Sequence, residues 1–440
     1  MTKILHLVHC VDTEGPLKET LYATFERVEA ILGLTDKPTL SNLKLLQTAS
    51  HPKLDAEKNE LASLIFSEKL LSYNDSWEKI DSMLSEIMSK EYRGKYLDDF
   101  GEGWKFTWCC MDHVGFNYEN PRHRDIGHHH VFDRYVAHIR DSSAGDEIGF
   151  HYHPISFKGD VNVPATNYLS HMPKIFEILA RKIIDRDWFP SCYRPGFHTT
   201  RPDSNWFLEQ YIPFEYANQR EFFGNSTANQ NDVGNGRFGY WENAPLSWVP
   251  YNPSHDDYQT PGNCRRLIAR CMNVGTRHRL LTDQDIQLAF EQANDVGSAI
   301  ISITNHDFRD MRDDIAASFE RIRSYSSNFK DVRIKNSTGS EAMKEFVPNQ
   351  EAIRCETFVS GNTIEITTDD KIFGPQPFLA IKTKFGQYYH DNLDIIEPFR
   401  RWRYTLDEST VPRELIQSLK IAFNQRNGNP QVHSILSDEI

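Results

Sequence analysis

Two histidines placed two residues apart are the residues whose types and spacing most directly suggest chemistry. They lie in the run Glu147–Pro154, EIGFHYHP. Successive side chains of an extended strand point to opposite faces, so His151 and His153 are predicted to project from one face, as two metal ligands would. Pro154 lacks a backbone donor, which suits the point where a strand leaves its sheet. Taken alone the pair is weak evidence, because most such pairs on strands pack or face solvent.

Other apolar runs of the chain also end in polar residues that could complete such a site. One carboxylate and two imidazoles make three protein ligands for Zn²⁺ or a similar divalent ion and leave a position open for water. The ion would lower the pKa of that water to about 7, and a second carboxylate could then act as general base. The residues at these strand ends are Asp12 and Glu14, Arg194, and His306.

The remaining two residues fit the other roles that hydrolysis requires. A nearby cation favours the charged form of a carboxylate, so Arg194 could keep the base ionised and oriented. His306 could protonate a leaving amine or alkoxide. Together these residues indicate metal-assisted acyl hydrolysis. Either carboxylate, Asp12 or Glu14, could contact the ion. The alternative for Arg194 is an ordinary structural ion pair, and the alternative for His306 is a buried core histidine.

The elements that must position these residues alternate between strand and helix, which predicts a parallel α/β core. Residues 36–100 are charged and carry several helical patterns, so they are predicted to be a helical insertion. Beyond residue 345 the pattern changes to alternating strands, with a hairpin turn expected at Gly361-Asn362 and one helix at Arg413–Phe423. We therefore predict an α/β chain with residues 1–345 as a distorted (β/α) barrel and residues 346–440 as a small β-rich accessory domain.

Composition limits the classes of function. The 440 residues have a formal net charge of −13 with charges interspersed, which argues against a nucleic-acid partner. Seven cysteines without a C-x-x-C pair suit a reducing compartment. Met1–Val11 resembles a first strand more than a signal peptide, and no apolar run approaches the roughly 20 residues of a membrane span. We expect a cytoplasmic protein.

Four segments, in this order, resemble the motifs of carbohydrate esterase family four, the nodulation-type polysaccharide deacetylases. Val11–Gly15 is similar to the first motif and Glu147–Pro154 to the second, metal-binding motif. Tyr193–Phe197 is similar to the third, and Ile303–Asp307 to the last. The resemblance covers about residues 1–340 and implies a distorted (β/α) barrel that removes an acetyl or similar acyl group from an amino sugar. It also implies the roles of the residues: Asp12 as base, Glu14, His151 and His153 as metal ligands, Arg194 as the contact of the base, and His306 as acid.

The chain departs from the family pattern at three points. The family more often spaces its metal histidines four apart, whereas here position 155 is Ile. The tighter His-x-His-Pro form resembles an outlying branch associated with surface-polysaccharide biosynthesis. Glu14 replaces the usual Asp. The family's fourth motif, an acidic residue that steadies the acid histidine, has no clear match, and the residues considered for that role are Asp307, Asp310 and Glu215.

The sequence thus predicts a metal-dependent hydrolase of amide C–N bonds, most simply with Zn²⁺, acting on a carbohydrate or a nucleotide- or lipid-linked sugar. An amidase or deformylase for a non-sugar substrate and a catalytically silent glycan-binding or assembly protein are the alternatives. A homodimer and the role of the C-terminal domain are left open. Further residues considered were His113 and His198 as pocket lining, the 128–130 histidine run as a second metal site or a solvated loop, and Trp241, Trp248 and Tyr251 as sugar-stacking or core residues.

Overall fold

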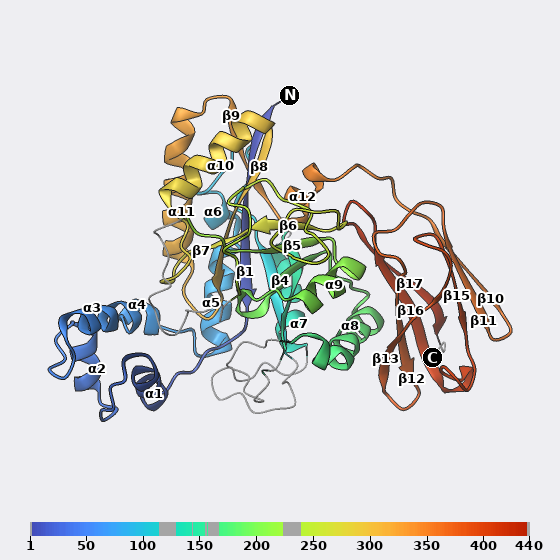
Figure 1. Cartoon of the computed structure of the whole chain (residues 1–440), viewed down its shortest axis with the longest axis horizontal. Helices are drawn as coiled ribbons and strands as arrows, with labels where there is room; N and C mark the ends of the chain where they lie inside the picture. Colours follow the sequence, from blue (N-terminus) through green and yellow to red (C-terminus); the bar gives the residue numbers. More distant parts are fainter. Residues whose placement is uncertain are drawn as a thin grey trace.

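The computed structural model describes residues 2–113, 129–142, 144–154, 156, 167–222 and 239–437. A parallel sheet of nine strands forms its centre, in the order β6-β5-β4-β3-β2-β1-β8-β7, with β9 also paired to β1 (Figure 1). Every pair in this sheet is parallel. The strands are β1 (Lys3–Thr13), β2 (Thr107–His113), β3 (Glu147–His153), β4 (Cys192–Pro195), β5 (Phe214–Asn218), β6 (Leu267–Arg270), β7 (Met272–Asn273), β8 (Ser298–His306) and β9 (Val332–Ser337).

A single chain segment brings the two edges of this sheet together. β6 pairs with β5 at one edge and β7 pairs with β8 at the other, and only Cys271 separates β6 from β7. The sheet is therefore a nearly closed parallel barrel, which confirms the predicted α/β barrel. In such a barrel the carboxyl ends of the strands meet at one end, where functional side chains gather.

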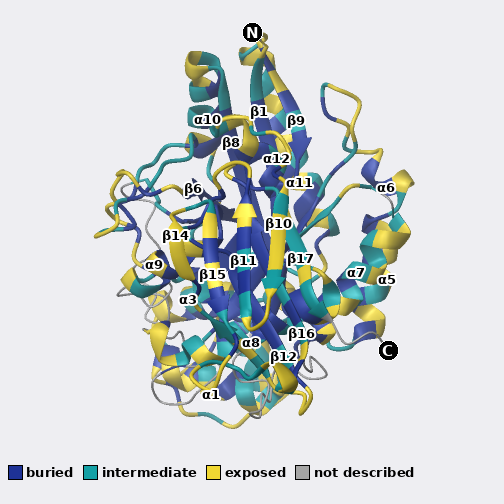
Figure 2. Ribbon diagram, turned by 90° about the vertical axis from the view of Figure 1, so that its right-hand side faces the viewer, coloured by how far each residue is buried: buried dark blue, intermediate teal, exposed yellow. Residues whose placement is uncertain are grey.

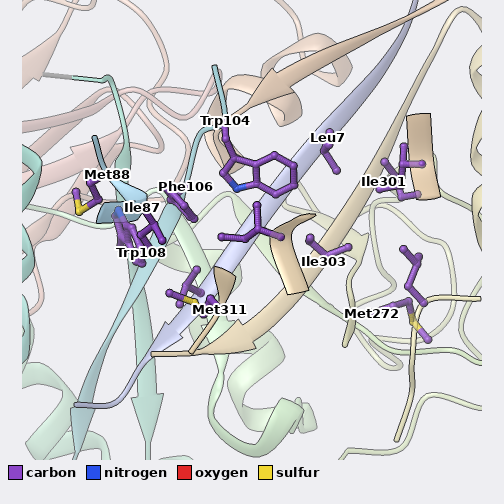
Figure 3. Close-up of a cluster of buried hydrophobic side chains, with 14 of the residues drawn as sticks. Leu7, Ile87, Met88, Trp104, Phe106, Trp108, Met272, Ile301, Ile303 and Met311 are labelled. Carbon is purple, nitrogen blue, oxygen red and sulfur yellow. The ribbon is translucent and has the colours of Figure 1, made fainter. Parts of the chain in front are cut away.

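Helices cover the barrel, and their apolar faces supply its outer core. Figure 3 shows part of that core, in which Trp104, Trp108 and Met311 lie among aliphatic residues of β1 and β8. Parallel strands that are neighbours need a crossover connection, and a helix between the two strands provides it. The covering helices are α7 (His130–Ser142), α8 (Met172–Arg186), α9 (Pro202–Tyr211), α10 (Asp283–Val296), α11 (Arg312–Tyr325) and α12 (Gly339–Met343).

The chain between β1 and β2 forms six helices, five of which lie within residues 36–100, where the helical insertion is predicted. The first four form a lobe beside the barrel (Figure 1) with its own small core, which includes Phe25, Val28 and Phe66. The first helix ends at Gly33, which adopts φ 68° and whose N–H caps the carbonyl of Glu29. These helices are α1 (Leu21–Leu32), α2 (Leu40–Gln47), α3 (Ala56–Ile65), α4 (Glu68–Leu71), α5 (Trp77–Ile87) and α6 (Lys90–Arg93).

The C-terminal region forms two four-stranded antiparallel sheets, ordered β10-β11-β15-β14 and β13-β12-β16-β17. Figure 2 views the first of these, in which the central strands β11 and β15 alternate buried with more exposed residues. The sheets enclose a core that includes Trp402 and Leu419. The strands are β10 (Cys355–Ser360), β11 (Thr363–Thr368), β12 (Phe378–Thr383), β13 (Tyr388–Asp391), β14 (Asp394–Glu397), β15 (Arg401–Thr405), β16 (Ile416–Asn424) and β17 (Pro430–Ser437).

This region confirms one local prediction and contradicts another. The hairpin turn at Gly361-Asn362 joins β10 to β11, and Gly361 adopts φ 57°. The helix predicted at Arg413–Phe423 is wrong, because only a short 3-10 turn occurs there and β16 follows it. Leu419, Ile421 and Phe423 lie in one buried core and Ala422 lies in another, so successive side chains face opposite sides, as in a strand.

The second sheet packs against the barrel. Phe378, Ala380 and Ala422 share one buried cluster with apolar residues of α8 and α9. Polar contacts cross the same boundary, because Asn424 Nδ2 donates to the carbonyls of Pro190 and Tyr211, both at 2.8 Å. None of the helices in the described part of the chain is long and apolar enough to cross a membrane.

Candidate functional site

Three of the predicted residues converge at the carboxyl ends of β1 and β3. Glu14 directly follows β1, and His151 and His153 lie on one face of β3. Glu14 Oε1 lies 3.6 Å from His151 Nε2 and 3.3 Å from His153 Nε2, and the two Nε2 atoms are 2.8 Å apart. All three residues are buried. The cluster could hold a metal ion.

The chemistry of these donors fits a small divalent ion. A tetrahedral ion with bonds of about 2.0–2.2 Å holds its ligand atoms roughly 3.4 Å apart. The two distances from Glu14 Oε1 are close to this value, and the two imidazole nitrogens lie nearer to each other. His151 Nδ1 donates to the backbone carbonyl of Arg194 at 2.9 Å, so a neutral His151 presents a lone pair at Nε2. Burial disfavours charge on His151, but Asp12 and Glu14 outweigh burial and raise the pKa of the imidazole. The pocket therefore favours positive charge.

Asp12 lies beside this cluster and is held by Arg194. The side chains of both residues are almost fully buried, at 1% and 0% exposed. Arg194 Nε donates to Asp12 Oδ1 at 2.6 Å, and Nη2 donates to Oδ2 at 3.0 Å, a bidentate pair. Burial alone would raise the pKa of Asp12, but the Arg194 guanidinium together with His151 holds that pKa below its ordinary value. Asp12 is therefore an oriented, ionised carboxylate.

His306 stands next to both carboxylates. It is the register partner of Asp12 across β1 and β8. Its Nε2 lies 3.9 Å from Asp12 Oδ2 and 3.8 Å from Glu14 Oε1, and 21% of its side chain is exposed. Burial lowers the pKa of His306 to about 4, against the opposing effect of Glu14 and Asp12. His306 is therefore uncharged at neutral pH and must gain a proton before it can donate one.

Asp307 fixes the turn that carries Glu14. Its carboxylate accepts the N–H groups of Glu14 at 2.8 Å and Gly15 at 3.0 Å, and the hydroxyl of Tyr135 at 2.9 Å. Burial raises the pKa of Asp307 to about 7, although these hydrogen bonds oppose the shift. The sequence offers Asp307 as a partner of His306, but its carboxylate instead binds the turn after β1 and so orients the predicted metal ligand Glu14. No sequence pattern indicates this role, because the bonded amides lie far from Asp307 in the chain.

The other two carboxylates considered for that role also have different partners. Asp310 pairs with Arg312, and Glu215 pairs with Arg266 and accepts the hydroxyl of Thr200 at 2.7 Å. Neither arrangement points to His306.

A tight turn after β4 adds two side chains to the site. Phe197 and His198 adopt φ 53° and 54°, in the left-handed region that residues other than glycine rarely adopt. The ring of Phe197 packs edge-on against His153, with centroids 4.9 Å apart. Arg194 Nη2 donates to His198 Nδ1 at 2.7 Å. The sequence predicts His198 as pocket lining and includes Phe197 only within the third motif.

The remaining residues considered from the sequence lie elsewhere or pack. His129 contacts Asp112, and His130 is exposed and packs on Trp77, while His128 and the His113 side chain lie outside the described residues. Two of the aromatic residues considered for sugar stacking are core residues, Trp241 at 2% and Trp248 at 1% exposed. Tyr251 is half-buried and donates to the carbonyl of Tyr258 at 2.8 Å.

Comparisons with known proteins do not assign a family. No protein-family model matches the chain, and no curated protein matches it. Among solved structures, the Cellulomonas fimi endo-beta-1,4-mannanase double mutant is similar over 77% of this chain and 87% of its own. The identity is 11% and the TM-score 0.25, so no argument rests on this likeness. The deacetylase resemblance accordingly depends on the four motifs and on the geometry of the residues that they contain.

Proposed function

We propose that this protein is a metal-dependent hydrolase that removes an acetyl or similar acyl group from the nitrogen of an amino sugar or glycan precursor. One observation carries the proposal. A buried set of three metal-type donors, Glu14, His151 and His153, adjoins an ionised Asp12 and an uncharged His306. A glycan-binding protein would have no need of two proton-transfer groups beside such a cluster.

The ion that these donors would hold, Zn²⁺ by their chemistry, acts as a Lewis acid and makes water acidic enough to lose a proton near pH 7. Asp12 takes that proton while the water oxygen bonds to the acyl carbon. Asp12 then passes the proton to His306, 3.9 Å away, because an uncharged imidazole must first become imidazolium to act as the acid. As the C–N bond breaks, His306 protonates the departing amine. The products are the free amino sugar and a carboxylic acid.

The wider proposal includes features that come from the sequence. We place the catalytic barrel in residues 1–345 and an accessory domain in residues 346–440, and we expect a nucleotide- or lipid-linked sugar as substrate in the cytoplasm. The oligomeric state, with a homodimer as one option, is open to measurement by light scattering.

Metal binding is the first test. Protein stripped with a chelator should bind one Zn²⁺ per chain in a calorimetric titration. Glu14→Gln and His151→Ala should each lower the affinity at least about tenfold, because each removes a ligand. His255→Ala is the matched control, since His255 is a largely exposed loop histidine. Wild-type affinity in His151→Ala would contradict the proposed centre.

Acyl release is the second test. The zinc-loaded protein is incubated with N-acetylated amino sugars, free and linked to a nucleotide, and acetate is measured. Asp12→Asn should lower the rate by 10² to 10⁴, the usual contribution of a general base. N-formyl and O-acetyl sugars run in parallel identify the bond that is cleaved. Acetate release by Asp12→Asn at the wild-type rate would exclude the assigned base.

A further inference from the structure

The turn Gly196–His198 is held in a strained conformation by contacts on several sides. Two consecutive residues with side chains adopt φ above 50°, which costs free energy that surrounding contacts must offset. Trp241 Nε1 donates to the carbonyl of His198 at 3.1 Å, and Thr199 Oγ1 donates to that of Phe197 at 3.0 Å. Such strain concentrates at functional sites, so the side chains that this turn directs are candidates for a role.

Arg194 determines which nitrogen of His198 carries the proton. A guanidinium has only donors, so His198 Nδ1, at 2.7 Å from Nη2, must accept. A neutral imidazole that accepts at Nδ1 carries its hydrogen on Nε2. A second proton would face the cation of Arg194, and burial together with that cation keeps the pKa of His198 well below its ordinary value. His198 is thus an uncharged donor with a fixed tautomer.

The Nε2–H group has no partner in the part of the chain that the structure describes. The side chain is nevertheless buried, at 5% exposed, and its ring centroid lies 6.4 Å from that of His306. A donor in a largely buried side chain that has no protein acceptor is free to bond a ligand that reaches it. The rings of His306 and His278 each lie 6.4 Å from that of His198, and Arg194 Nη2 joins His198 Nδ1 to Asp12. His198 therefore lies in the same pocket as the two proposed proton-transfer residues.

We propose that His198 is a catalytic residue whose Nε2–H donates a hydrogen bond to the acyl carbonyl oxygen of the substrate, the atom that gains negative charge as water adds. This inference rests on the proposed acyl hydrolysis. A preorganised neutral donor aimed at a developing oxyanion stabilises the transition state more than the ground state. The ligand class is an amide or ester carbonyl.

Two substitutions separate this role from that of merely holding Arg194. In His198→Asn the side-chain oxygen replaces Nδ1 as acceptor for Arg194, but nothing replaces Nε2–H. In His198→Gln the amide nitrogen reaches the position of Nε2, but no acceptor remains at Nδ1. Asn tolerates left-handed backbone, so His198→Asn is expected to fold. Substitution by Asn should lower kcat about 10² or more with little change in KM, and Gln should retain more of the rate.

The opposite order, with His198→Asn near wild type and His198→Gln impaired, would show that His198 only holds Arg194 and would overturn the proposal. A loss expressed in KM alone would do the same, because a ground-state contact is not an oxyanion donor. Zinc affinity, measured on both variants by chelator competition, should stay within about threefold of wild type.

One measurement is independent of the substrate. Nitrogen NMR of histidine-labelled protein, with His198→Asn used for assignment, should show His198 with its proton on Nε2 from pH 5 to pH 8. A proton on Nδ1, or a second proton within this range, refutes the inference even if the hydrolase is confirmed. Conversely, a confirmed tautomer with no acyl release from any sugar would refute the proposed function. The catalytic role of His198 would then fall with it, because that role rests on the proposed function, whereas the fixed tautomer would stand.

Discussion

Substitution of Arg194 by Met is expected to lower the free energy of unfolding by about 3 to 5 kcal/mol at pH 7. The reason is burial: both side chains of the Asp12–Arg194 pair are at most 1% exposed, so removing one partner leaves a desolvated charge. Loss of the bonds to the Tyr216 carbonyl and to His198 leaves two further acceptors unsatisfied. Met fills most of the vacated volume, so a cavity contributes little.

The pair can be separated from its surroundings by a double variant. Arg194→Met with Asp12→Leu removes both charges, and buried ion pairs replaced by apolar groups often cost little. The double variant should therefore be more stable than Arg194→Met by roughly 2 kcal/mol or more. If the double variant is as unstable as the single one, the uncompensated carboxylate is not the cause of the loss.

The effect must also depend on pH in a definite direction. In the wild type the pKa of Asp12 lies below its ordinary value of 3.8, so the stabilisation by the pair is present above that value and is lost as the pH falls. Without Arg194, burial raises this pKa, and acid then neutralises the stranded carboxylate. The difference between wild type and Arg194→Met should therefore shrink from pH 7 to pH 4.

Urea unfolding followed by tryptophan fluorescence measures these differences. Seven of the eight tryptophans precede residue 345, so the signal reports mainly on the barrel. A cost below about 1 kcal/mol for Arg194→Met at pH 7, or a cost that grows toward pH 4, would refute the reasoning.

Two further predictions follow from other buried groups. His9 accepts from Trp104 Nε1 at 3.1 Å and hydrogen-bonds Asn305 Oδ1 at 2.9 Å, and burial lowers its pKa to about 4. The unfolded chain therefore binds more protons between pH 6.5 and 4, and on the order of 3 kcal/mol is lost as the pH falls through this window. His9→Gln should flatten the fall of the free energy of unfolding with decreasing pH, measured by urea titration. An unchanged pH dependence would exclude His9 as its cause. Gly196→Ala should weaken zinc binding about tenfold or more in chelator competition, because its Cβ would lie 2.8 Å from His153 Cδ2, and wild-type affinity would refute this steric argument.

The sequence predicts much of the barrel and the residues at its strand ends because both depend on local patterns. Apolar runs alternate with amphipathic helices, and the carboxyl ends of parallel strands meet at one end of the barrel. Asp12 and His306 become register partners across β1 and β8, and His151 and Arg194 across β3 and β4. Residues far apart in the chain thus meet at one level because the strands align in register.

Other parts of the site depend on backbone conformations and long-range contacts that local patterns do not encode. The orientation of His198 requires two consecutive left-handed residues, a conformation that only a few per cent of non-glycine residues adopt. The role of Asp307 depends on amides nearly 300 positions earlier in the chain. The error at Arg413–Phe423 has a similar origin, since a short apolar run fits a helix or a strand until its partner strands are known.

Arg194 links the separate parts of the site through two chemically different groups. Its backbone carbonyl accepts from His151 Nδ1, which fixes the tautomer of a proposed metal ligand, whereas its guanidinium holds Asp12 and His198. Substitution of the side chain removes only the second set of contacts. Arg194→Met should therefore retain zinc affinity within a few fold of wild type while losing acyl release, because the ligand stays oriented and the base does not. Loss of zinc binding in this variant would mean that the carboxylate of Asp12, freed from Arg194, rearranges the metal centre itself.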